Sequence, residues 1–135
     1  MGLDTSHGCW HGAYSAFARW RRELARAAGY RILEPSFDSP DYDLPWDMFE
    51  NKNYQGEWDT VPGDDPLLYL LVHSDCDGVI HPEQGVHIAR RLESLLPLLD
   101  ESASGGHLTS VRAKTQQFID GLKAAAAAGE DVEFS

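Results

Sequence analysis

The sequence predicts one helix-dominated α+β domain, residues 1–135, with three to four helices and at most a small two- or three-stranded sheet. The length of 135 residues allows one domain with a hydrophobic core and is short for two. Three segments carry apolar residues at helical spacing, whereas the alternation typical of strands is limited to short stretches. We therefore expect helices to form most of the core.

The first predicted helix lies between Gly12 and Gly29. Its apolar residues recur at steps of three and four and share one face, which we expect to be buried: Ala13, Phe17, Trp20, Leu24 and Ala27. Arg19, Arg22 and Arg26 fall on the opposite face of the same helix. These arginines form either a solvated surface or a binding site for an anion.

The second half of the chain contains two more predicted helices. One begins at Pro82 and is expected to kink or end at Pro97, because proline leaves an earlier carbonyl unpaired. The last begins after Thr109 or Ser110 and stops at Gly129. The buried faces are expected to contain Ile88, Leu92, Leu95, Leu96 and Leu99 in one helix, and Val111, Phe118, Leu122 and Ala125 in the other.

Two shorter segments are read from local composition. Residues 67–72 form an apolar run after Asp65 and Pro66 that fits a short helix or a buried strand, and periodicity does not separate the two. Residues 131–135 alternate between polar and apolar side chains. We expect them to add an edge strand against residues 2–5.

An acidic, aromatic segment, residues 34–66, follows the first helix. It contains ten acidic residues, one basic residue, Lys52, and five of the seven prolines, and it shows no periodicity. We therefore expect a long loop. Its aromatic side chains are expected to lay it over the core as a cover for a site: Phe37, Tyr42, Trp46, Phe49, Tyr54 and Trp58.

Composition excludes several classes of partner. The formal net charge is -11, with 22 acidic and 11 basic residues, which disfavours a long nucleic acid as partner. No apolar run reaches the roughly 20 residues of a membrane-spanning helix, and the first residues lack the pattern of a signal peptide. We expect a soluble protein of the cytosol, with Cys9 and Cys76 as reduced thiols or, alternatively, as ligands of one shared metal ion. A homo-oligomer is left open.

The first polar cluster lies just before the first helix and contains His7, Trp10, His11 and Tyr14. Aromatic and imidazole rings beside a helix N-terminus suit an anion or a flat heterocycle, because free N–H groups and stacking faces meet there. The spacing of the two histidines also allows a shared metal ion. The alternative is a capped helix entry with a buried tryptophan.

The second cluster, residues 73–84, resembles an EF-hand calcium loop. Asp75, Asp77, the Val79 carbonyl and Gln84 fall at positions that hold the cation, with a glycine between the second and third of them. His73 replaces the first aspartate of that loop, and a glutamine replaces its last glutamate. The pattern predicts a partly hydrated Mg²⁺ or Ca²⁺ ion, or a turn in which both aspartates cap local N–H groups.

Longer stretches of the chain resemble a family of small bacteriophage and prophage proteins with no settled activity. The resemblance is carried by Leu-Asp-Thr-Ser-His at residues 3–7, Cys-Trp-His-Gly at 9–12, Tyr-Ser at 14–15, Arg-Trp-Arg at 19–21, residues 73–78 and Gly-Glu-Asp-Val-Glu-Phe at 129–134. It implies a phage protein that sequesters or degrades a host immune nucleotide signal, or that inhibits a host protein.

Three functions remain open at this level. In the first, His7, Trp10, His11, Tyr14, Arg19 and Arg22 bind a small anionic, nucleotide-like ligand and sequester it. In the second, a metal at Asp75 and Asp77 activates water to hydrolyse a phosphoester, with His7, His11 or His73 as the general base. In the third, the acidic segment 34–66 binds and inhibits a host protein.

Overall fold

The computed structural model describes residues 2–32, 42–43, 66–73, 76–99 and 110–135. Its helices are α1 (Tyr14–Ala27), α2 (Leu67–Val72), α3 (Pro82–Leu95) and α4 (Val111–Ala128), with short 3-10 turns η1 (Ser6–Gly8) and η3 (Leu96–Leu98). Its strands are β1 (Gly2–Asp4), β2 (His11–Ala13), β3 (Arg31–Ile32), β4 (Tyr42–Asp43), β5 (Val79–Ile80) and β6 (Val132–Glu133). The helix-dominated α+β class is confirmed.

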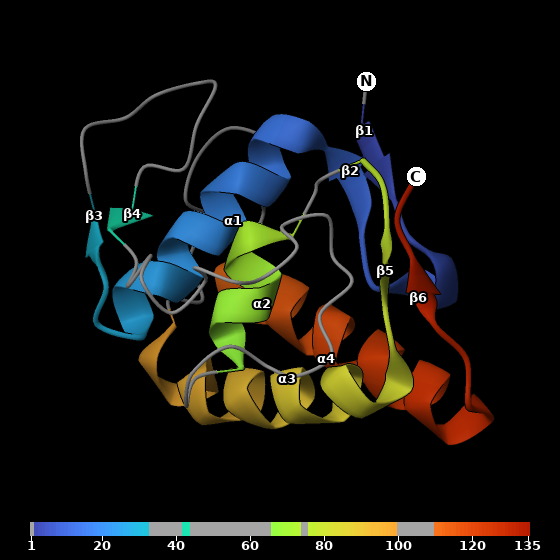
Figure 1. Cartoon of the computed structure of the whole chain (residues 1–135). Helices are drawn as coiled ribbons and strands as arrows, with labels where there is room; N and C mark the ends of the chain where they lie inside the picture. Colours follow the sequence, from blue (N-terminus) through green and yellow to red (C-terminus); the bar gives the residue numbers. More distant parts are fainter. Residues whose placement is uncertain (1, 33–41, 44–65, 74–75, 100–109) are drawn as a thin grey trace.

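The strands form three antiparallel pairs within the described ranges: β1 with β2, β3 with β4, and β5 with β6. An isolated bridge joins Thr5 to Phe134, so β6 lies between β5 and the end of β1. In Figure 1 both chain ends lie on this side of the molecule, while α3 runs beside α4 on the other. The expected pairing of residues 131–135 with residues 2–5 is present, and β5 is an additional partner.

The helices end where local chemistry predicts. Ser110 accepts a hydrogen bond from the Ala113 N–H at 3.2 Å and caps α4, which stops at Gly129 in the left-handed region, φ 68°. The α3 helix gives way at Leu95 to the η3 turn that contains Pro97. Residues 67–72 form a helix, which settles the ambiguity of that run.

The core is built on a cluster of stacked aromatic rings. Trp20 lies 5.2 Å from Trp10 and 4.8 Å from Phe118 between ring centroids, and Phe17 lies 5.1 Å from Trp10. The indole N–H of Trp20 donates to Thr115 at 2.9 Å, so this polar group is satisfied inside the core. The cluster fixes α1 against α4 and against the segment that precedes α1.

The expected cover loop lies almost wholly outside the described residues. Of segment 34–66, the structure describes only β4 and Pro66. None of the helices in the described part combines the length and apolar character that a membrane-spanning helix requires.

Candidate functional site

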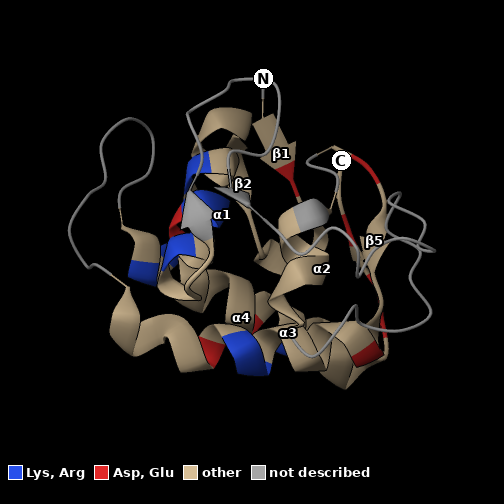
Figure 2. Ribbon diagram, turned by 60° about the vertical axis from the view of Figure 1, so that its left-hand side comes forward, with Lys and Arg blue, Asp and Glu red and all other residues tan. Residues whose placement is uncertain are grey.

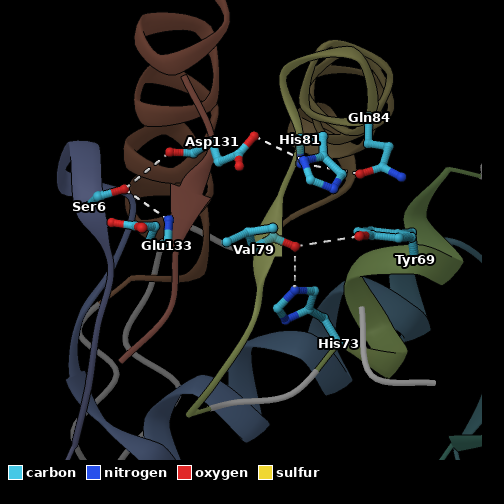
Figure 3. Close-up of polar contacts among 8 residues, drawn as sticks. All are labelled: Ser6, Tyr69, His73, Val79, His81, Gln84, Asp131 and Glu133. Atoms are coloured by element: carbon cyan, nitrogen blue, oxygen red, sulfur yellow. Dashed lines mark hydrogen bonds and ion pairs between the residues drawn. The ribbon is translucent and has the colours of Figure 1, made fainter. Parts of the chain in front are cut away.

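The best-defined polar network joins the two ends of the described chain. Asp4 and Ser135 exchange backbone hydrogen bonds of 3.4 and 3.0 Å, and the Phe134 N–H donates to the Gly78 carbonyl at 2.9 Å. These bonds hold the last residues between β1 and the turn before β5. Figure 3 shows the side chains that gather beside β5 and β6.

Ser6 is the centre of the network. Its Oγ accepts a hydrogen bond from the Glu133 N–H at 2.9 Å, and it lies 2.9 Å from His7 Nδ1. The Asp131 carbonyl, at 3.5 Å, is a more distant acceptor for the same hydroxyl. The hydroxyl hydrogen therefore has its shorter contact with His7 Nδ1 when that nitrogen carries no hydrogen.

His7 joins this hydroxyl to a carboxylate. Its Nε2 lies 3.1 Å from Glu130 Oε1, on the opposite side of the ring from Ser6. His7 has φ 60° and ψ 14°, and it is the one non-glycine residue with positive φ in the described ranges. This left-handed backbone turns the ring toward both partners.

The other side of β6 carries a second histidine contact. His81 Nδ1 lies 2.9 Å from Asp131 Oδ1, next to the carbonyl that faces Ser6. Adjacent acidic residues, Glu130 and Asp131, thus bind two histidines from different elements as α4 turns into β6. The contacts fix the path of the strand.

An open cleft of about 580 Å³ lies beside Ser6. Three acidic residues from three separate segments line it: Asp4, Asp77 and Glu133. The remaining lining residues are Thr5, Ser6, Gly78, Val79, Phe134 and Ser135, so no lysine or arginine is among the described residues around it. The cleft is polar and negatively charged.

The predicted residues of the first cluster are separated by the fold. Trp10 is fully buried in the aromatic cluster, so its ring faces are occupied by core side chains and by Lys114, whose Nζ lies 4.8 Å from the ring centroid. His11 is exposed on β2 and lies 3.4 Å from Asp4 Oδ1. Tyr14 packs partly buried against the core. Of the alternative, a capped helix entry with a buried tryptophan, the buried ring is present, whereas Ala13 precedes α1 without a side-chain cap.

Arg19 and Arg22 lie half-buried on α1 and both have interaction partners. Figure 2 shows several basic residues on α1, and acidic residues on β1, toward the C-terminus and on the helices. Among the described residues, His7 lines a second cleft that contains neither arginine, and the role of the arginines as ligands for an anion stays a prediction.

The predicted metal loop is only partly described, since Asp75 lies outside the described residues. Asp77 Oδ1 accepts from the Gly78 N–H at 2.8 Å. The Val79 carbonyl faces His73 Nε2 at 2.9 Å and the Tyr69 hydroxyl at 3.4 Å, as Figure 3 shows. Gln84 Oε1 accepts from the His81 N–H at 3.1 Å and completes the start of α3.

Three of the predicted metal ligands, Asp77, Val79 and Gln84, therefore already have protein partners. Val79 and Gln84 hold the turn and the helix start. Of the alternative, a turn in which both aspartates cap local N–H groups, the Asp77 contact is present, and Asp75 lies outside the described residues. Among the described residues, no group of three or more His, Cys, Asp or Glu side chains is placed to hold a metal ion. A Mg²⁺ or Ca²⁺ ion at Asp75 and Asp77 stays a prediction.

The sequence analysis missed Ser6, Glu130, Asp131 and Glu133 as one group. Ser6 and His7 adjoin in sequence, but their partners are more than 100 residues away, and one sequence carries no signal for such a contact. Comparison of the chain with protein-family models, with curated proteins and with solved structures gave no match.

Proposed function

We propose that the protein is a small binding protein whose cleft takes a cationic ligand with an amine or guanidinium group. The observation that supports this is the meeting of Asp4, Asp77 and Glu133 around one cleft of about 580 Å³. This volume suits a small molecule. Carboxylates from three segments, with no base among the described lining residues, raise the local concentration of cations.

The class of function is the one the sequence predicts, a binding protein, but the charge of the favoured ligand is opposite. The nucleotide hypothesis relied on Trp10 as a stacking surface, and that ring is enclosed in the core. A nucleotide bound at the arginines of α1 is the second candidate, since basic residues gather there (Figure 2). In the phage context that the resemblance implies, either ligand would be sequestered.

Calorimetric titration at low salt tests the proposal, with agmatine and spermidine as cationic probes and ATP as the anionic probe. We expect the cations to bind and the double variant Asp77→Asn/Glu133→Gln to bind them several-fold more weakly. Each exposed charge pair contributes about 0.5 to 1 kcal/mol, because solvent screens it. The proposed site loses two such charges in this variant without a large change in side-chain volume.

Glu83→Gln/Glu93→Gln is the matched control, because both residues are exposed on α3 and are not part of the cleft lining. It removes two negative charges elsewhere on the molecule. If this variant weakened binding of the cations equally, the effect would come from net charge alone, and the cleft would be rejected as the binding site. If only ATP gave a heat of binding in the titration, the result would favour a nucleotide bound at the arginines of α1.

A further inference from the structure

We propose that Ser6 is an activated nucleophile and that the protein transfers acyl groups from small esters to water through it. The proposal rests on the hydrogen-bonded series from Ser6 Oγ to His7 Nδ1, 2.9 Å, and from His7 Nε2 to Glu130 Oε1, 3.1 Å. A hydroxyl, an imidazole and a carboxylate in this order form the arrangement that activates serine in hydrolases. It is independent of the charge of the ligand proposed above.

For the neutral imidazole, the partners of the ring define one tautomer. The Glu130 carboxylate only accepts, so it orients the hydrogen onto His7 Nε2 and leaves Nδ1 as an acceptor for the Ser6 hydroxyl. The Glu133 N–H donates to Ser6 Oγ at 2.9 Å. This donor stabilises negative charge that develops on the oxygen as its proton leaves.

The backbone of His7 supports a role beyond packing. The residue adopts φ 60°, a region that non-glycine residues rarely occupy and that recurs at functional sites. The strain places the imidazole between a hydroxyl and a carboxylate. Ser6 itself lines the open cleft of about 580 Å³, so a substrate can approach its oxygen.

The chemical step balances with water alone. Ser6 Oγ bonds to the ester carbonyl carbon while its proton passes to His7 Nδ1. The bond from that carbon to the alcohol oxygen then breaks, and the alcohol takes the proton from His7. Water, deprotonated by the same nitrogen, hydrolyses the acyl-serine and restores the hydroxyl.

The first experiment uses the full chain and a fluorophosphonate probe, followed by intact-mass analysis and peptide mapping. We expect one covalent adduct on Ser6 and, with 4-nitrophenyl acetate, release of 4-nitrophenolate by the same protein. Because this experiment uses the unsubstituted protein, its result tests the proposal even if substituted proteins fail to fold. A folded protein that gains no adduct on Ser6 would overturn the proposal and leave the network as a structural clamp.

The second experiment separates activation from simple exposure of the hydroxyl. Glycine suits the left-handed backbone, and His7→Gly removes the base. We therefore expect the rate of labelling to fall by about 100-fold or more, the usual contribution of a general base. Ser94→Ala is the control, since Ser94 is exposed on α3 outside the cleft and its hydroxyl donates to the Arg91 carbonyl. An unchanged labelling rate in a folded His7→Gly protein would contradict the proposal.

Discussion

At the residue scale, the two cysteines differ in reactivity because their surroundings differ. Cys9 is buried beneath α4, and this burial raises the pKa of its thiol from 9.0 to about 12, while a hydrogen bond with Thr5 acts in the other direction. Cys76 is exposed. Since only the thiolate reacts, we expect iodoacetamide at pH 8 to label Cys76 in the folded protein, and Cys9 only after unfolding. Mass spectrometry of digested protein distinguishes the two sites.

The same pKa predicts a pH dependence of stability. Below pH 9 the Cys9 thiol is protonated in both states and contributes nothing. Between about 9 and 12 the unfolded chain releases this proton and the folded chain keeps it, so the free energy of unfolding falls as the pH rises. Denaturant melts of Cys9→Ala across this range should show a shallower decline. Parallel curves for the two proteins would contradict a titration at this site.

The packing of Gly121 explains why α4, a helix otherwise rich in alanine, contains a glycine at this position. A Cβ at this position would overlap Cys9 Sγ and lie 3.0 Å from the Cys9 Cα and N atoms. We expect Gly121→Ala to destabilise the fold by about 1 to 3 kcal/mol, although alanine favours the helix, because backbone atoms cannot move aside cheaply. Ala124→Ser adds one atom on the exposed side of α4 and serves as the control in thermal melts.

At the scale of elements, α2 is a helix of six residues that depends on its neighbours. Arg21 Nη1 donates to the carbonyls of Leu70, Leu71 and His73, at 3.3, 3.3 and 2.6 Å, and so binds the end of α2. Its guanidinium also lies 4.5 Å from the centroid of the Phe17 ring. A positive charge at a helix C-terminus stabilises the unpaired carbonyls there.

We therefore expect Arg21→Ala to lower the free energy of unfolding by about 1 to 3 kcal/mol, as hydrogen bonds to a charged group contribute. Arg90→Ala removes the same charge from the exposed face of α3 and should change it by less than about 0.5 kcal/mol. Urea melts followed by circular dichroism measure both variants. Similar losses for the two would show that Arg21 acts through net charge alone.

The elements differ in how far the sequence predicts them. Apolar periodicity identified α1, α3 and α4 and most of their buried residues, because a helix face is a local property of the chain. The run at 67–72 stayed ambiguous, because its hydrophobicity is uniform and its helical form depends on contacts such as those of Arg21. Local pattern carries no information about a partner 49 residues away.

At the scale of the whole molecule, the same limit applies to the candidate site. The sequence predicted Trp10 as a ligand-binding residue because it lies in a polar cluster, yet the tertiary structure places it in the core, fully buried. The network around Ser6 joins the first residues to the last, over separations of 123 to 127 residues. The sequence contains every member of the network, but their proximity comes only from the docking of β6.

The docking of β6 should therefore govern both stability and the site. Phe134 is buried, 4.1 Å from the His73 ring and 6.2 Å from the Phe17 ring between centroids, whereas Glu133 points outward. We expect Phe134→Ala to cost about 3 to 5 kcal/mol, the range for truncating a buried aromatic side chain. Thermal melts measure the loss, and hydrogen exchange of the Ser135 and Asp4 amides reports release of the strand.

Glu133→Ala is the control for this prediction, because it truncates the neighbouring side chain on the exposed face of the same strand. It should leave the melting temperature nearly unchanged and the two amides protected. The Glu133 N–H still reaches Ser6 Oγ in this variant, since a backbone group makes that bond. If Phe134→Ala melted like Glu133→Ala, β6 would be a peripheral strand, and the Ser6 network would need another explanation for its fixed geometry.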